Sequence, residues 1–387
     1  PHHDSVFTHH LALVAEQQQA GSRSSTYKAK ARAGREKTFR KVKVLFVLDR
    51  FDPDLGGSEK LFKILTDELR NSNTDVTVLC CKHSKRKPES HIVEFPFRSR
   101  ILFALVGNLW VLYYARKADV IHSSSFFSGI ACTLAVLFGK KAVLTYHELW
   151  LNRWNELPYL SAFQKWQLKT LERFLVAIPF QRVVGVSEFT YQGLLTAYPS
   201  NRVRKVMNAL LVPKSLPEKT RGNSYLMYGR LGVSKGWHLI NELKTQSLPP
   251  DFHLQLVLPQ EPKWLWQKIN AQLKAPFIEV KNELPEEELF ALIQKAKAVL
   301  IPSYSEGFGF AAAECSAMNT PIIHSGRGAL NEVVYGTTVK MTEYSGKGLA
   351  EAIWKFERGE VEVIQKKNSD VLEMANAYLS IYRELVS

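Results

Sequence analysis

Two glutamates eight positions apart, Glu306 and Glu314, lie on either side of a glycine-bearing loop. An apolar run predicts a buried strand over Ala298–Ile301, and the residues after the loop predict a helix. Gly309 and Phe310 would then offer free backbone N–H groups at the N-terminus of that helix, where an anion binds favourably. The carboxylates would flank the anion and accept hydrogen bonds from pairs of hydroxyls. We expect a ligand that joins an anion to a sugar and a ribose.

Two cations lie in a glycine-rich turn that leads from the predicted strand Tyr225–Tyr228 into a helix. Arg230 presents a planar guanidinium and Lys235 a compact ammonium, and Gly229 precedes them. Together they could neutralise a pyrophosphate. Taken alone, such a pair is typical of a solvated surface. The glutamate loop in the same half of the chain favours the binding role.

A pair of glycines, Gly56 and Gly57, lies between the first predicted strand and its helix. Glycines at this position let the backbone approach a phosphate or sugar closely. The turn is not a GxGxxG fingerprint, so we do not expect a nicotinamide cofactor. The acidic pair Asp52 and Asp54 just before it could hold a divalent metal, but Asp and Pro are ordinary turn formers there. We expect no metal site.

His147 follows the predicted strand Ala142–Thr145, where an imidazole could point into a cleft and donate to a sugar hydroxyl or a phosphate. A purely structural histidine is the alternative. His122 also follows a strand, but it enters a run of serines and is the weaker candidate. The sequence therefore favours His147 as a site residue.

Short apolar runs alternate with amphipathic helical patterns from Lys41 onward, which predicts parallel, doubly wound sheets. Two such series occur, and the proline-bearing stretch Asn208–Pro217 between them predicts an interdomain connection. Open parallel sheets bind ligands beyond the carboxyl ends of their strands, which is where the candidate residues fall. The predicted segments are a flexible extension over 1–40, an N-terminal Rossmann-like domain over 41–210, a C-terminal one over 211–368, and a final helix over 369–387.

The chain has 387 residues and 45% hydrophobic composition, which is enough for two sizeable cores. Four cysteines lie in apolar surroundings without metal-ligand spacing, which indicates packing roles in a reducing compartment. The net charge of +14 is uneven, because residues 1–187 carry 28 Lys and Arg against 16 Asp and Glu. The N-terminal half should therefore meet an anionic partner. No zinc-finger or RRM pattern is present, so we do not expect nucleic acid.

Two helical segments raise the question of membrane contact. The apolar run from Ile101 to Ala115 is too short to span a bilayer, and a core helix is one interpretation. The other is a partly exposed helix that enters a bilayer surface, with basic residues at its ends. The segment Phe163–Ile178 carries a basic stripe beside Trp166, as interfacial and solvated helices both do. No secretory signal is evident, so we expect a cytoplasmic protein, with peripheral contact on the inner membrane face left open.

Taken together, these residues resemble the retaining nucleotide-sugar glycosyltransferases of the GT-B fold, family 4. The resemblance covers Lys41 to the C-terminus. Its most specific motif is Glu-x7-Glu, Glu306 to Glu314, followed by the Arg230 and Lys235 turn and by Gly56-Gly57-x-Glu59. Ser187 and Asn208 match weaker family positions. The implied fold is α/β, with two facing Rossmann-like domains and a C-terminal helix that crosses back to the N-terminal domain.

The resemblance also implies the roles of individual residues. Arg230 and Lys235 would contact the diphosphate, Glu314 the ribose and Glu306 the transferred sugar. His147 and the Gly57 loop would close over the donor from the N-terminal domain. The implied reaction is retaining hexosyl transfer from a UDP- or GDP-sugar to a glycan or glycolipid, and we expect no metal or other cofactor. The basic N-terminal half suggests an anionic or membrane-associated acceptor, such as a lipid-linked saccharide, a phospholipid or a lipopolysaccharide core. The donor-binding residues are Gly56, Gly57, Ser187, Asn208, Gly229, Gly307, Phe308, Gly309, Phe310 and Glu314, and the catalytic residues are Arg230, Lys235, Glu306 and His147.

Other functions stay open at this point. A sugar-nucleotide epimerase could use the same fold, whereas a phosphorylase would need a pyridoxal-lysine context that the chain lacks. A non-catalytic binder of anionic membranes or nucleic acid would explain the charge but not the convergence of several loops on one cleft. The segment Leu258–Pro262 replaces the family's usual glycine turn, so the resemblance does not choose between UDP and GDP.

Overall fold

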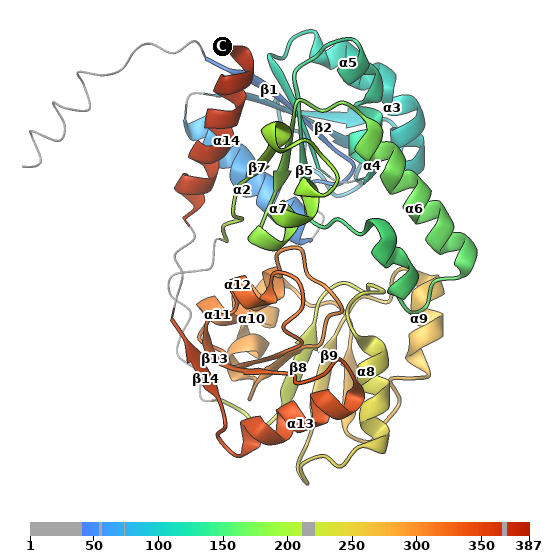
Figure 1. The fold of residues 1–387 in the computed structure, drawn as a ribbon, viewed down its shortest axis with the longest axis vertical. Helices are drawn as coiled ribbons and strands as arrows, with labels where there is room; N and C mark the ends of the chain where they lie inside the picture. Colours follow the sequence, from blue (N-terminus) through green and yellow to red (C-terminus); the bar gives the residue numbers. More distant parts are fainter. Residues whose placement is uncertain (1–40, 54–55, 73, 125, 211–220, 366–369) are drawn as a thin grey trace, which may run out of the picture. The chain divides into compact units, whose positions relative to one another are not determined.

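The computed structural model describes residues 41–387 apart from 54–55, 73, 125, 211–220 and 366–369 (Figure 1). Residues Val42–Ser387 form one compact unit, which holds both sheets and the space between them. The predicted extension 1–40, residues Leu211–Pro217 of the predicted connection and Asp54 of the acidic pair lie outside the described residues.

The first half of the unit, the N-lobe, is built on a parallel sheet. Among the described residues its strand order is β3-β2-β1-β4-β5-β6-β7, and in the register Val44 of β1 lies beside Val76 and Val120. The central strands are buried on both faces, which explains their continuous apolar sequences. The strands are β1 (Lys43–Leu48), β2 (Asp75–Cys81), β3 (Ile92–Phe95), β4 (Val120–Ser124), β5 (Ala142–Tyr146), β6 (Arg182–Gly185) and β7 (Val203–Lys205).

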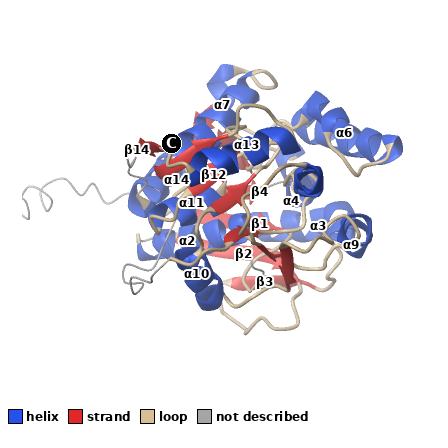
Figure 2. Ribbon diagram, turned by 90° about the horizontal axis from the view of Figure 1, so that it is seen from below, coloured by secondary structure: helices blue, strands red, loops and turns tan. Residues whose placement is uncertain are grey.

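Helices cover both faces of this sheet (Figure 2). One face packs against α2 and the other against α3 to α7, each through its own apolar cluster. The predicted helix Phe126–Phe138 divides at Cys132 into two short helices. The helices are α2 (Gly57–Asn71), α3 (Arg100–Ala115), α4 (Phe126–Ala131), α5 (Thr133–Leu137), α6 (Ala162–Ala177) and α7 (Glu188–Leu195).

The second half, the C-lobe, repeats the plan with the order β10-β9-β8-β11-β12-β13-β14, in which only the β13–β14 pairing is antiparallel among the described strands. One face packs on α8, α9 and α13, and the other on α10 to α12. The strands are β8 (Tyr225–Tyr228), β9 (Leu254–Val257), β10 (Ile278–Lys281), β11 (Val299–Ile301), β12 (Ile322–His324), β13 (Gly336–Lys340) and β14 (Glu362–Ile364). The helices are α8 (Trp237–Glu242), α9 (Lys263–Asn270), α10 (Glu286–Lys295), α11 (Phe310–Ala317), α12 (Leu330–Val333) and α13 (Gly346–Glu357).

The last helix, α14 (Val371–Val386), returns to the N-lobe and packs beside α2 (Figure 1). Its Tyr382 hydroxyl lies 2.6 Å from Nδ1 of His122, whose Nε2 is 2.8 Å from the Thr145 hydroxyl. Burial lowers the pKa of His122 to about 3, so its imidazole is neutral at pH 7. His122 therefore fastens α14 to the sheet and is no candidate for the site.

The predicted α/β fold with two Rossmann-like sheets and a crossing C-terminal helix is confirmed. Four strands were not predicted: β3, β7, β13 and β14. They lie towards the sheet edges, where polar residues such as Glu362 and Lys205 break up the apolar runs that mark central strands. The fold brings the carboxyl ends of β1, β5, β8 and β11 towards one cleft between the lobes.

Candidate active site

A cavity of about 490 Å³ lies between the two lobes. Loops from both sheets line it, so residues more than two hundred positions apart face one space. Its lining includes Gly56, Gly57, Lys60, His147, Glu148, Tyr228, Gly229, Arg230, Lys235, Pro259, Glu283, Leu284, Ser303, Glu306, Gly307, Phe308, Gly309, Phe310 and Glu314.

Arg230 of the C-lobe makes a direct ion pair with Glu59, which is buried at the start of α2 in the N-lobe. Burial raises the pKa of Glu59, but the charge of Arg230 and several hydrogen bonds outweigh it and leave that pKa below its usual value. Glu59 is therefore a carboxylate at neutral pH. Arg230 remains 47% exposed, so its other guanidinium edge is open to a ligand in the cleft.

Lys235 is held by a different carboxylate. Its Nζ lies 2.7 Å from Oε1 of Glu306, and the Ser303 hydroxyl donates to the same oxygen at 2.7 Å. This arrangement fixes the Glu306 side chain while its second oxygen stays available. The turn after β8 thus presents a cation, and the loop after β11 presents the carboxylate that pairs with it.

Glu314 lies in the second turn of α11, almost fully buried. The Tyr228 hydroxyl donates to its Oε2 at 2.8 Å, and Lys60 Nζ lies 3.6 Å from its Oε1. Burial raises the pKa of Glu314, and the Lys60 charge and the Tyr228 hydrogen bond offset part of that effect. Lys60 also contacts Glu286 at 2.7 Å, so this end of the cavity is rich in carboxylate.

The loop before α11 depends on two glycines. Gly309 is the N-cap of α11 and has φ +92°, a left-handed conformation that favours glycine. A Cβ on Gly307 would lie 1.5 Å from the His147 carbonyl oxygen, so only glycine allows the two lobes to approach this closely. Gly309 and Phe310 at the start of α11 line the cavity together with His147.

His147 lies deep in the cleft, with Nε2 2.9 Å from the Ser124 hydroxyl. Its Nδ1 is buried and has no hydrogen-bond partner among the described residues. Burial lowers the pKa of His147 to about 4. The charge of Glu59 raises this pKa, and the charge of Arg230 lowers it. The imidazole is neutral at pH 7 and can donate or accept a single hydrogen bond from a ligand.

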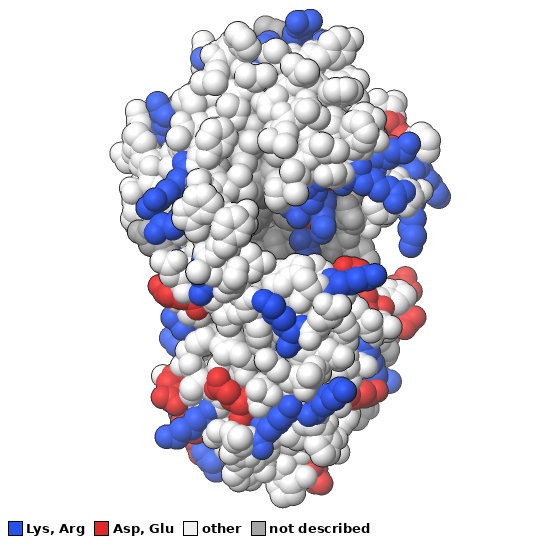
Figure 3. All heavy atoms as spheres, turned by 90° about the vertical axis from the view of Figure 1, so that its right-hand side faces the viewer, with Lys and Arg blue, Asp and Glu red and all other residues white. Residues whose placement is uncertain are grey.

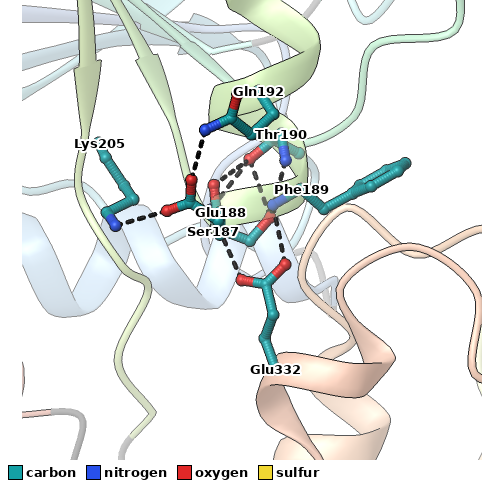
Figure 4. Close-up of polar contacts among 7 residues, drawn as sticks. All are labelled: Ser187, Glu188, Phe189, Thr190, Gln192, Lys205 and Glu332. Carbon is teal, nitrogen blue, oxygen red and sulfur yellow. Dashed lines mark hydrogen bonds and ion pairs between the residues drawn. The ribbon is translucent and has the colours of Figure 1, made fainter.

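The lobes are also joined beside the cavity, at the N-terminus of α7 (Figure 4). Glu332 of α12 accepts hydrogen bonds from the backbone N–H of Glu188 at 2.7 Å and of Phe189 at 2.8 Å. Ser187, the N-cap of α7, donates to the Gly307 carbonyl at 2.6 Å. A carboxylate at a helix N-terminus is electrostatically favourable, so Glu332 holds α12 against α7, and the Ser187 hydrogen bond holds the Gly307 loop against the N-lobe.

The structure brings together all the predicted site residues except Ser187 and Asn208. Ser187 lies outside the cavity lining and contacts the Gly307 loop instead. Asn208 is fully buried, and Oδ1 and Nδ2 of its side chain have no hydrogen-bond partner among the described residues. The roles assigned to individual residues remain predictions.

Several cavity residues were not predicted from the sequence: Lys60, Tyr228, Glu148 and Glu283. Lys60 follows the Gly56-Gly57 turn within one helical turn, a spacing that could have suggested it. No local sequence pattern identifies the other three as site residues, because only the contacts made in the fold bring them to the cavity. Asp52 pairs with Lys63 at 2.9 Å, as a surface turn residue does.

Two features are absent from the described residues. No group of three or more His, Cys, Asp or Glu side chains in this part of the chain is arranged to hold a metal ion. No helix among the same residues combines the length and the apolar character that crossing a membrane requires.

Two family models match consecutive parts of the chain. The one described as Glycosyltransferase Family 4 matches residues 55–209, and the one described as Glycosyl transferases group 1 matches residues 211–370.

Among curated relatives, the GDP-mannose:cellobiosyl-diphosphopolyprenol alpha-mannosyltransferase of Xanthomonas campestris is 25% identical over 312 residues, 73% of this chain and 78% of that protein. The MMP alpha-(1->4)-mannosyltransferase of Mycolicibacterium hassiacum is 39% identical over 104 residues, 27% of this chain and 25% of its own. Among solved structures, sucrose-phosphate synthase from Thermosynechococcus elongatus has a TM-score of 0.64 at 18% identity, covering 90% of this chain and 95% of that one.

Replacing Glu332 tests the contact between the lobes. In Glu332→Ala, the amides of Glu188 and Phe189 lose a charged acceptor worth about 1–3 kcal/mol, so they should exchange their hydrogens faster. Hydrogen exchange measured by NMR or mass spectrometry gives the result. Glu351→Ala, which removes an exposed carboxylate from α13, is the matched control. Unchanged exchange at both amides would show that this carboxylate does not hold α7.

Proposed function

The chain belongs to glycosyltransferase family 4, and on that premise we propose that it moves a hexose, with retention at the anomeric carbon, from a nucleotide diphosphate sugar to a hydroxyl of a glycan or glycolipid. One observation carries the proposal. Arg230, Lys235 and the N-terminus of α11 meet around one cavity together with Glu306 and Glu314. Positive groups suit a diphosphate, and carboxylates suit the hydroxyls on either side of it.

Each group has a role that fits its place. Glu314, pre-oriented by Tyr228, accepts hydrogen bonds from the ribose hydroxyls. Glu306, held by Lys235 and Ser303, accepts them from the transferred sugar. The diphosphate lies between them, against Arg230 and the amides of Gly309 and Phe310. This order places the anomeric carbon beside His147, at the boundary of the lobes.

The chemistry follows from the charge that develops. Breaking the bond between the anomeric carbon and phosphate oxygen leaves an oxocarbenium-like sugar and a diphosphate with added negative charge. Arg230, Lys235 and the dipole of α11 stabilise that leaving group, and they do so strongly because they are already oriented in a partly dry cleft. The acceptor hydroxyl attacks from the face that the diphosphate leaves, and a phosphate oxygen takes its proton. This course gives retention and requires no metal.

Two features support GDP-mannose as the donor. The relative matched over 312 residues is named as a transferase of mannose from GDP-mannose. In this chain, Glu283 lines the cavity beside Leu284 and Pro259. Guanine offers a carboxylate two adjacent N–H donors and uracil offers one, so Glu283 favours GDP.

The acceptor is proposed to be a glycan linked to a lipid diphosphate. That relative is named for an acceptor on diphosphopolyprenol. The N-terminal residues 1–187 hold most of the excess positive charge of the chain, which suits an acceptor that carries phosphate.

A panel of donors tests the proposed function. GDP-mannose at 100 times its Kd should raise the free energy of unfolding by about 2.7 kcal/mol, seen as a higher Tm, and UDP-glucose or UDP-galactose should do less. GDP should then appear when a lipid-diphosphate-linked disaccharide is added. In Glu283→Gln the preference for GDP over UDP should fall. A chain that no nucleotide sugar stabilises, and that releases no nucleotide, would contradict the proposal.

Loss of the guanidinium of Arg230 should slow the transfer reaction. Arg230→Ala should raise the barrier by about 2–4 kcal/mol, which corresponds to a fall of about 30- to 1000-fold in kcat/KM. Steady-state kinetics with saturating acceptor measures this. Arg358→Ala, at the exposed end of α13, should leave kcat/KM unchanged. Wild-type kcat/KM in Arg230→Ala would remove Arg230 from the mechanism.

A further inference from the structure

Helix α3 exposes a row of large apolar side chains. Leu105 is 67% exposed and Leu109 61% exposed, and Ile101 and Tyr113 continue the row at four-residue intervals. The opposite face of the helix, which includes Phe103 and Val111, is fully buried in the N-lobe core. The exposed row is therefore not needed to fold the lobe, and its contact with water is unfavourable.

Neighbouring helices extend this apolar surface. Helix α3 packs against α4 and α5, and α4 packs against α6. Figures 1 and 2 place α3, α4 and α6 next to one another on one side of the N-lobe. Leu137 and Phe138 are exposed at the end of α5, and Phe163, Trp166 and Phe174 are exposed on α6. We call these exposed residues of α3, α5 and α6 the apolar face.

The charge around the apolar face is mostly positive, although Asp119 follows the basic pair at the end of α3. No Asp or Glu occurs over 95–118 or 126–141, and the one acidic residue over 157–178 is Glu172. Glu172 is buried and accepts hydrogen bonds from Trp150 and Trp154, so it adds no charge to the surface. Basic residues stand at or just beyond the ends of α3 and α5, namely Arg98, Arg116, Lys117 and Lys141, and Arg173 lies within α6. On this side Figure 3 shows a broad uncharged surface on the upper lobe, with Lys and Arg around most of its margin and acidic atoms at the right-hand edge.

We propose that the apolar face docks the protein on an anionic lipid bilayer. Leucine and aromatic side chains would enter the boundary between headgroups and acyl chains, and the basic residues at the helix ends would contact anionic headgroups. A second copy of this chain fits less well, because two like faces would bring their basic rims together. The inference rests on the proposed lipid-linked acceptor, which such docking would bring within reach of the cleft.

Vesicle binding tests the docking proposal. The full chain should cosediment with phosphatidylcholine vesicles that contain phosphatidylglycerol, and bind less to phosphatidylcholine alone or at high salt. Leu105→Glu with Leu109→Glu should weaken binding at least about tenfold, and so should Arg116→Glu with Lys117→Glu. Val363→Glu with Leu372→Glu is the matched control, because it adds the same charge at exposed apolar positions away from this face.

Two further measurements separate the possible failures. The shift in Tm with GDP-mannose should be the same in all these variants, so its absence in the wild type would count against the proposed function and not against docking. Equal vesicle binding by the wild type and both surface variants would overturn the docking proposal. So would a dimer in size-exclusion chromatography that Leu105→Glu with Leu109→Glu dissociates, if the chain binds no vesicles.

A separate observation concerns Glu148 in the cleft. It lines the cavity, and its Oε1 is buried with no hydrogen-bond partner among the described residues. An unpaired buried carboxyl oxygen is costly unless a ligand completes its hydrogen bonds. A Cβ on Gly307 would lie 3.1 Å from the Glu148 Cα, so this glutamate sits against the Gly307 loop, at the sugar end of the site.

The surroundings of Glu148 set its protonation. Burial and the charge of Glu306 raise its pKa to about 8, although the charge of Lys235, a hydrogen bond with the Ser305 side chain and the charge of Arg153 oppose them. Its carboxyl is therefore mostly protonated at pH 7 and can donate a hydrogen bond. Since the folded state holds the proton more tightly than the unfolded chain, this group stabilises the fold most at low pH, and that contribution is lost between about pH 4.5 and 8.

We propose that Glu148 recognises the transferred sugar by donating a hydrogen bond to one of its oxygens, next to the hydroxyls that Glu306 accepts from. The proposal rests on the proposed donor. It assigns opposite hydrogen-bonding roles to two neighbouring carboxyl groups, one a donor and the other an acceptor.

Binding measurements on three variants test this role. Glu148→Ala should weaken the binding of GDP-mannose by about tenfold or more and leave the binding of GDP unchanged. Glu148→Gln keeps an N–H donor, so its affinity for GDP-mannose should stay within about threefold of that of the wild type. Wild-type affinity for GDP-mannose should fall above about pH 8, and that fall should be absent in Glu148→Gln. Glu156→Gln, at an exposed position in the turn that follows, is the control.

Each contrary result has a distinct meaning. If Glu148→Gln loses as much affinity as Glu148→Ala, or if Glu148→Ala binds GDP-mannose normally, Glu148 is not a donor to the sugar. If neither GDP nor GDP-mannose binds the wild type, the proposed function itself fails.

Discussion

The cleft depends on cations that are held in place by carboxylates before any ligand arrives. Arg230 is fixed by Glu59 across the lobes, and Lys235 is fixed by Glu306 within the C-lobe. An uncompensated pair of cations in a partly buried site would repel and disperse, so the carboxylates keep them oriented. In the mechanism that we propose, the diphosphate takes over part of these contacts. This preorganisation is the main source of the catalysis that we propose.

The two lobes meet at a point where backbone approaches backbone. Gly307 leaves no room for a side chain against His147, Ser187 binds the Gly307 carbonyl, and Glu332 caps α7. These contacts bring the histidine of one sheet and the N-terminus of α11 in the other lobe to the same cavity. The packing of α14 on α2 and the His122 hydrogen bonds add a second connection from the end of the chain. Reactive groups from distant segments therefore share one site because the interface is specific.

Much of this arrangement follows from local sequence. Continuous apolar runs identified the central strands, because strands buried on both faces have no polar positions. Glu306, Glu314, Arg230 and Lys235 could be assigned to one site because each follows a strand of the same predicted sheet. What could not be predicted depends on tertiary contacts. Tyr228 lies within a strand, and only the fold shows that its hydroxyl orients Glu314. The Gly307 loop that lies against Glu148 likewise comes from the opposite lobe.

The central claim is that Arg230 and Lys235 bind the diphosphate. A crystal structure of the full chain with GDP tests it most directly, because it shows the contacts of both side chains. We predict that the guanidinium and the ammonium contact the diphosphate, that the α11 amides of Gly309 and Phe310 contact it as well, and that Glu314 binds the ribose. GDP bound elsewhere, or bound with both cations still engaged only by Glu59 and Glu306, would contradict this claim.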